Sequence, residues 1–103
     1  MLSYELTPDA DADLEDIARY TNLEWGPDQA ALYIDKLHQG FHEIATKHAM
    51  NTTFHKRLPQ VFVTHCEHHH YVFYLRSKKT KPVIIAVLHK RMDMLTRLKA
   101  RLS

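Results

Sequence analysis

The stretch "VIIAVLHKRMD" ends a long apolar run in side chains that could act on a phosphate group. Metal-free cleavage of RNA needs a base near the 2′-hydroxyl, cations that hold the scissile phosphate, and an acid for the leaving oxygen. His89, Lys90 and Arg91 could supply part of this set, and Tyr71 and Tyr74 stand in the preceding apolar run. The run could therefore end in an active site, in a binding surface or in solvent.

A second group of reactive side chains lies in "THCEHHHY", which holds His65, Cys66, His68, His69 and His70. Histidine and cysteine are zinc ligands, but neighbouring residues of a strand point to opposite faces. Two or three of these side chains at most could converge, and the cysteine has no partner at CxxC spacing. We therefore expect no metal site and an exposed turn between strands, with a zinc site as the weaker alternative.

The first half of the chain predicts two helices that pack as an antiparallel hairpin. After a short strand in "LSYEL", Thr7 can cap a helix that begins at Pro8, because proline at the first position lacks only an unpaired N–H. Apolar residues at helical spacing continue to "WGP", where Trp25 is expected to pack under a corner that Gly26 permits. A second amphipathic helix begins at Pro27 and continues to about residue 45.

The second half changes from a helical period to the period of strands. Residues 49–59 are mostly polar and predict a loop, whereas "VFVTHC", "HYVFYLR" and "VIIAVLH" predict three consecutive strands. "VIIAVLH" is apolar at every position before its histidine, as expected of a strand covered on both faces. Helical spacing returns in "MDMLTRLKARL". The expected fold class is α+β, in the order β-α-α-β-β-β, with the helical hairpin on a mostly antiparallel sheet and a short C-terminal helix.

Size and composition restrict the class of protein. A chain of 103 residues, 45% of them hydrophobic, can form one compact domain, expected over residues 1–103, and is too short for two. No apolar run reaches the roughly 20 residues of a membrane span, and the acidic N-terminal segment does not resemble a signal peptide. We therefore expect a cytoplasmic protein that does not enter a membrane.

The net charge of +2 conceals an uneven distribution. Residues 1–30 hold eight carboxylates and one arginine, a net charge of −7, whereas residues 56–103 hold eleven lysines and arginines and two carboxylates, a net charge of +9. Folding should therefore give an acidic side and a basic side. A basic side can attract nucleic acid or an acidic protein partner.

The combination of these segments resembles the toxins of bacterial type II toxin-antitoxin modules, in the superfamily that contains ParE and RelE, and is most similar to the ParE branch. The resemblance covers nearly the whole chain, in the same order of elements. It rests on a helical pattern and on the closing "LHKRMD", of which all but the lysine match. The matching residues are Ala12, Asp13, Leu14, Ile17, Tyr20, Trp25, Gly26, Gln29, Ala30, Tyr33, Leu88, His89, Arg91, Met92 and Asp93.

The resemblance implies a toxin that a cognate antitoxin holds inactive, and it implies no cofactor. ParE-like toxins inhibit DNA gyrase and block replication, by binding and not by a reaction of their own. Arg91, Arg97 and Arg101 would then belong to the target-binding surface at the end of the last strand and the C-terminal helix. The antitoxin would bind along the helical hairpin near Trp25 and along the sheet.

Two alternatives accompany this interpretation. RelE-like relatives cleave messenger RNA without a metal, and here His89, Lys90 and Arg91 with a tyrosine would form the site, whether the substrate is RNA or DNA. The RelE-type pattern, however, has an arginine at about the position of Tyr71. A homologue that has lost its activity and acts only through protein contacts is the other alternative.

Purely structural roles are also expected at the closing motif. Met92 is expected to fill the core, Asp93 to cap the C-terminal helix, and Arg91 could pair with an acid of the first helix.

Overall fold

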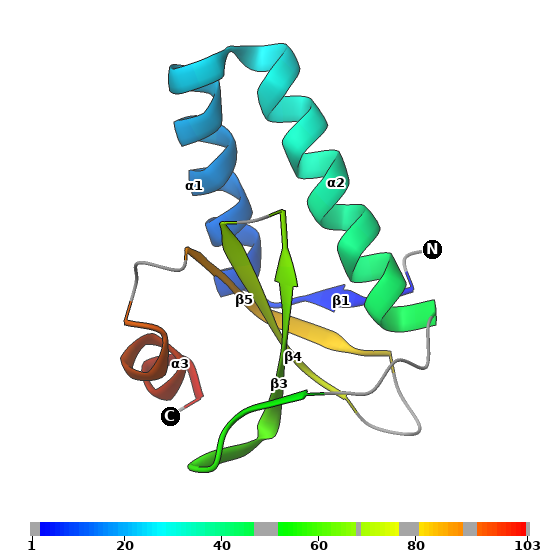
Figure 1. Ribbon diagram of the computed structural model, residues 1–103, viewed down its shortest axis with the longest axis vertical. Coiled ribbons are helices and arrows are strands. Elements are labelled where there is room, and N and C mark those ends of the chain that lie inside the picture. Colours follow the sequence, from blue (N-terminus) through cyan, green and yellow to red (C-terminus); the bar gives the residue numbers. More distant parts are fainter. Residues whose placement is uncertain (1–2, 47–51, 68, 77–80, 90–92, 103) are drawn as a thin grey trace.

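The computed structural model describes residues 3–46, 52–67, 69–76, 81–89 and 93–102, and Figure 1 shows how its elements are arranged. In chain order the elements are β1 (Glu5–Leu6), α1 (Pro8–Trp25), α2 (Pro27–Thr46), β2 (Thr52–His55), β3 (Leu58–Cys66), β4 (His70–Leu75), β5 (Val83–His89) and α3 (Met94–Leu102). The expected α+β class and the expected order of helices and strands are confirmed, with one strand added. Among the described helices none is long and apolar enough to cross a membrane.

The helical hairpin begins and turns where the sequence indicates. The Thr7 side chain accepts a hydrogen bond from the backbone N–H of Ala10 at 3.1 Å, and Pro8 is the first residue of α1. Gly26 ends α1 with φ 92°, a backbone conformation that residues with a Cβ rarely adopt, and its N–H donates to the carbonyl of Asn22. Pro27 then starts α2, so the two helices run back along one another (Figure 1).

The sheet has five strands in the order β1-β5-β4-β3-β2. Among the described strands, only the two-residue β1 pairs in parallel, with β5, and the other pairings are antiparallel. The loop predicted over residues 49–59 is wrong in part, because β2 pairs with β3 inside it. As an edge strand, β2 exposes Thr52 and Thr53 and has little of the apolar alternation that marks a half-buried strand.

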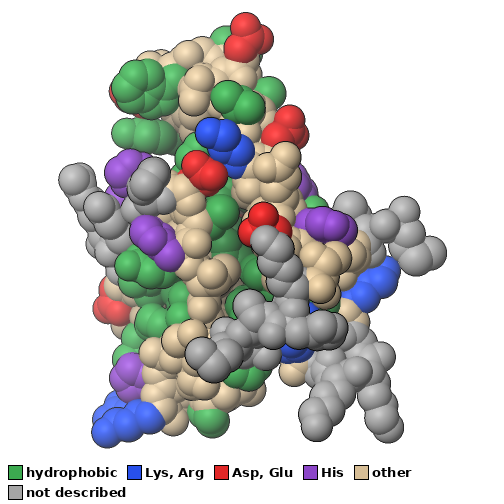
Figure 2. Space-filling model, turned by 45° about the vertical axis from the view of Figure 1, so that its right-hand side comes forward, with side chains coloured by type: hydrophobic (Ala, Val, Ile, Leu, Met, Phe, Trp, Pro, Cys, Tyr) green, Lys and Arg blue, Asp and Glu red, His purple; other side chains and the backbone are tan. Residues whose placement is uncertain are grey.

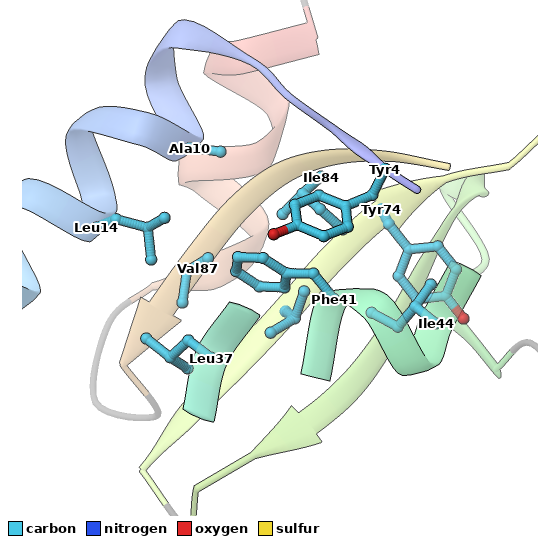
Figure 3. Close-up of a cluster of buried hydrophobic side chains, with 10 residues drawn as sticks. Tyr4, Ala10, Leu14, Leu37, Phe41, Ile44, Tyr74, Ile84 and Val87 are labelled. Carbon is cyan, nitrogen blue, oxygen red and sulfur yellow. The ribbon is translucent and has the colours of Figure 1, made fainter. Parts of the chain in front are cut away.

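Hydrophobic clusters cover both faces of the sheet. The helical hairpin packs on the first face, where Phe41 meets the ring of Tyr4 edge-on at 5.4 Å between centroids (Figure 3). β5 contributes Ile84 and Val87 to this cluster and Ile85 and Leu88 to the other, which confirms that the strand is covered on both faces. The first cluster consists of Tyr4, Ala10, Leu14, Leu37, Phe41, Ile44, Val72, Tyr74, Ile84 and Val87.

The second cluster lies on the opposite face, under α3. Leu98 of α3 is fully buried there with Val61, Phe73 and Leu88. Asp93 caps the helix as expected, since its carboxylate accepts from the backbone N–H of Thr96 at 3.2 Å and from the Thr96 hydroxyl at 2.8 Å. These hydrogen bonds lower the pKa of the Asp93 carboxyl. The expected core position of Met92 lies outside the described residues.

Charges are unevenly distributed over the folded chain. Figure 2 shows one face of the molecule, on which most of the visible acidic side chains lie in the upper half, over the helical hairpin, and most of the visible basic ones lie below them. The acidic N-terminal third forms β1, α1 and the start of α2. Eleven of the fourteen lysines and arginines come after residue 55, and three of these lie in α3 while none lies within a described strand. An acidic hairpin and a basic opposite end follow from this arrangement.

Candidate functional site

Arg101 has a partner within the chain. Its guanidinium forms two hydrogen bonds with the carboxylate of Asp13, from Nη1 to Oδ2 at 2.6 Å and from Nη2 to Oδ1 at 2.7 Å. The side chains of Arg101 and Asp13 are only 17% and 13% exposed. An acid of the first helix is thus paired with Arg101, which ties α3 to α1. That Arg101 belongs to a target-binding surface stays a prediction.

The same pair also reaches the central part of the sheet. Oδ2 of Asp13 accepts from the backbone N–H of Val87 at 2.9 Å, and Nη1 of Arg101 donates to the carbonyl of Ile85 at 3.0 Å. The hydrogen bonds that Arg101 donates to Asp13 raise the pKa of the guanidinium, which favours its charged form. α1, β5 and α3 thus meet at one buried ion pair.

Arg97 is the second of the three arginines that we expect at the target-binding surface, and it is exposed on α3. It lies on the solvent side of the helix together with Lys99. Arg91 and Lys90 lie outside the described residues. Of the three arginines predicted to bind the target, the structure therefore describes Arg97, which is exposed, and Arg101, which is paired with Asp13.

The structure does not bring the described members of the expected nuclease site together. His89 pairs with His70 across the β4–β5 ladder, whereas Tyr71 is the next residue along β4 and points to the opposite face. Tyr74 shares the face of His70 but pairs with Ile84, at the other end of the ladder, and burial raises the pKa of its hydroxyl. Neither tyrosine is therefore placed to act together with His89.

The histidine-rich turn forms two separate groups. His65 stacks on Tyr71 on one face of the sheet, with 4.8 Å between ring centroids. On the other face the ring of His70 meets His89 edge-on at 5.5 Å, and His69 stacks on His89 at 6.0 Å. Over the part of the chain that the structure describes, which leaves out His68, no three His, Cys, Asp or Glu side chains come together as metal ligands would.

His70 is held as a neutral ring by its surroundings. The Tyr33 hydroxyl lies 2.6 Å from Nδ1 of His70 and also donates to the carbonyl of Glu67 at 3.4 Å. The Tyr33 hydroxyl can make both contacts if its oxygen accepts the proton of Nδ1 of His70 while its own proton goes to the Glu67 carbonyl. Burial, and then the positive charges that His89 and His69 can carry, lower the pKa of His70 to about 4. Burial likewise raises the pKa of Tyr33 to about 12.

This lowered pKa predicts a loss of stability in acid. Between the ordinary histidine pKa of about 6.5 and the folded value of about 4, the unfolded chain takes up a proton at His70 that the native chain does not. The free energy of unfolding should therefore fall as the pH drops through this window, by roughly 1–2 kcal/mol for a ring that is partly exposed to solvent. Chemical unfolding of the wild type and of His70→Gln at pH 7 and pH 4.5 measures the effect.

The variant should lose less stability on acidification than the wild type. His65→Gln is the matched control, because His65 is exposed, and it should follow the wild type at both pH values. Equal losses in all three proteins would show that His70 is not the group responsible.

The tip of the helical hairpin exposes large apolar side chains. Trp25 is 73% exposed, Leu23 78% and Tyr20 65% on α1, and Leu32 of α2 is 48% exposed. The expectation that Trp25 packs under the corner is wrong, because the turn leaves no neighbouring element over this residue. We refer to Tyr20, Leu23, Trp25 and Leu32 together as the hairpin-tip patch, although Leu23 and Trp25, two residues apart on α1, point in different directions. Exposed apolar groups of this kind mark sites of protein contact, and Trp and Tyr are enriched where binding energy is concentrated.

One group of polar residues was not predicted from the sequence. His38 and His42 of α2 line a cavity of about 570 Å³ together with Ser3 and Tyr4, which precede β1. The spacing of the two histidines, in "HQGFH", places them on one face of a helix and could have indicated the pair.

Comparison with solved structures gives the class of fold. The chain is similar to a solved chain of the "Chromosomal ParDE TA system from P. aeruginosa", with a TM-score of 0.71, over 86% of this chain and 96% of that one. At 19% sequence identity this likeness shows the fold. The structure is therefore a small α+β domain with the fold of that chain.

Sequence comparison gives the family. Residues 4–94 match the family model described as "ParE toxin of type II toxin-antitoxin system, parDE". The chain is also 42% identical to "Toxin ParE" of Escherichia coli over 103 residues, which are 100% of this chain and 99% of the relative. The chain belongs to the ParE toxin family of type II toxin-antitoxin systems, as its resemblance to the ParE branch predicted.

Proposed function

We propose that this ParE toxin acts on DNA gyrase and blocks replication in the cytoplasm. Membership of the ParE family, over residues 4–94, is the observation that carries the proposal. The arrangement of the described side chains supports action by binding, because His89, Tyr71 and Tyr74 do not converge on one point. Exposed cations on α3, Arg97 and Lys99, offer a surface that an acidic region of a protein could bind.

Inhibition by binding needs a difference in affinity. A ligand shifts an equilibrium between two states of its target only if it binds one of them better. The toxin would thus favour the state of gyrase in which DNA is cleaved by binding that state more tightly. No cofactor takes part in this mechanism.

Incubation with supercoiled and relaxed plasmid tests the proposal. Lanes with and without gyrase and ATP, each with and without EDTA, are compared for supercoiling activity and for trapped cleavage products. Loss of supercoiling or accumulation of cleaved DNA only when gyrase is present is the expected result. Nicking or cleavage without gyrase would instead indicate a nuclease, and no change in any lane would contradict the proposal.

A charge reversal on α3 locates the target-binding surface. Arg97→Glu should weaken gyrase inhibition by at least tenfold in the toxin concentration required, because it replaces an exposed cation by a repelling charge. Lys36→Glu on the exposed side of α2 is the matched control and should inhibit as the wild type does. Equal inhibition by both variants would remove α3 from the target-binding surface.

The second partner is the cognate antitoxin that a parDE module implies. We propose that the antitoxin binds the helical hairpin at the hairpin-tip patch and extends along the sheet. The tip exposes apolar side chains, and carboxylates, including Glu24 and Asp28, are in excess around it. An antitoxin segment that combines apolar side chains with cations would complement this surface.

A further inference from the structure

A cavity of about 570 Å³ lies between the C-terminal half of α2 and the residues that lead into β1. Its lining includes two histidines of α2, His38 and His42. Residues four apart on a helix lie one above the other on the same face, so both imidazoles border the same space. The cavity is on the side of the molecule away from α3, and no part of the proposed gyrase contact uses it.

Hydrogen bonds and ring contacts fix the orientation of these two imidazoles. The Tyr4 hydroxyl lies 2.5 Å from Nδ1 of His38, and the Ser3 hydroxyl lies 2.8 Å from Nδ1 of His42. The His38 ring also meets Phe41 edge-on, with 5.5 Å between centroids. When each Nδ1 carries the proton and donates it to the hydroxyl oxygen, each Nε2 is left with a free lone pair.

With these tautomers, both rings would be held as metal-binding histidines usually are. A histidine that binds a metal through one ring nitrogen usually donates the proton of the other nitrogen to a neighbouring oxygen, which holds the ring in place. Two histidines at positions i and i+4 of a helix are a recurring pair of zinc ligands. Asp35 and Glu43 line the same cavity, and their carboxylates favour the approach of a cation.

We propose that His38 and His42 bind a transition-metal ion of the zinc and copper class through their Nε2 atoms. Imidazole nitrogens favour zinc, copper and nickel over magnesium or calcium. Within the described ranges no third His, Cys, Asp or Glu joins a cluster that could hold a metal, so the described part of the chain supplies two ligands. The remaining coordination positions of the ion are open to water or to a ligand from another protein chain.

Calorimetric titration of the EDTA-treated full chain with Zn²⁺ tests the proposal. The wild type should bind an ion at this site, and His38→Gln/His42→Gln should lose that site or bind at least tenfold more weakly. Glutamine can still hydrogen bond to the hydroxyls of Ser3 and Tyr4, so the fold is expected to persist. His65→Gln/His69→Gln is the matched control for the histidine-rich turn and should retain the site.

A measurement on the wild type alone locates the ion without any variant. Traces of Cu²⁺ added to the ¹⁵N-labelled protein broaden the amide signals nearest to the bound ion. Broadening that begins at residues 35–43 supports the proposal. Three results would each overturn the proposal: broadening confined to residues 65–70, unchanged Zn²⁺ binding by His38→Gln/His42→Gln, or no binding below millimolar Zn²⁺. None of these results bears on gyrase inhibition.

Discussion

Arg101→Ala is expected to lower the free energy of unfolding by about 2–4 kcal/mol, one of the largest effects of any single change in α3. The substitution leaves the Asp13 carboxylate largely buried without its cation, and an uncompensated buried charge costs about 3–5 kcal/mol when burial is complete. The pair is 17% and 13% exposed, so the expected loss is somewhat smaller. It also removes the hydrogen bond to the Ile85 carbonyl. Urea unfolding at pH 7 measures the change.

A double-mutant cycle separates the ion pair from the other contacts of Arg101. Asp13→Ala/Arg101→Ala should be less destabilised than the sum of the two single variants, because neither charge is then left alone, and a coupling of about 1–3 kcal/mol is expected. Arg97→Ala, at an exposed position of the same helix, is the control and should change stability by no more than about 0.5 kcal/mol. If the losses in the free energy of unfolding of the two single variants simply add up in the double variant, Asp13 and Arg101 do not stabilise the fold as a pair.

The secondary structure was predictable wherever a local signal determines it. Thr7 followed by Pro8 marked the start of α1, and Gly26 followed by Pro27 marked the turn, because caps and backbone restrictions act within a few residues. β2 was missed because an edge strand is held by its pairing with β3, and its own residues carry no clear pattern. Strand pairing is a property of the folded chain and not of a short segment.

The roles of single side chains were harder to predict than the elements that carry them. Arg101 and Asp13 are 88 residues apart, and their pairing depends on how α3 returns to the start of α1. Periodicity placed Trp25 on the apolar face of α1, but α1 extends past the end of the sheet there, and Trp25 is 73% exposed (Figure 1). The family, by contrast, was accessible from sequence, because its pattern extends over nearly the whole chain.

Trp25→Ala is expected to weaken antitoxin binding by about 30-fold or more. An exposed tryptophan at the centre of an interface commonly contributes at least about 2 kcal/mol, which corresponds to that change in Kd. The stability of the free toxin should change by no more than about 0.5 kcal/mol, because the side chain is 73% exposed and makes few contacts to lose. Calorimetry with the antitoxin encoded beside this toxin measures the affinity.

Variants at neighbouring positions determine whether the loss of antitoxin affinity is shared by the other residues of the hairpin-tip patch. Leu23→Ala should also weaken binding, while Gln29→Ala, an exposed polar residue at the start of α2, should leave the affinity within a factor of about two. If the antitoxin uses cations against the acidic hairpin, its association should also slow as salt rises, because screening shortens the range of the attraction. Unchanged affinity in both Trp25→Ala and Leu23→Ala would place the antitoxin elsewhere on the toxin, and the exposed tip would then need a different partner.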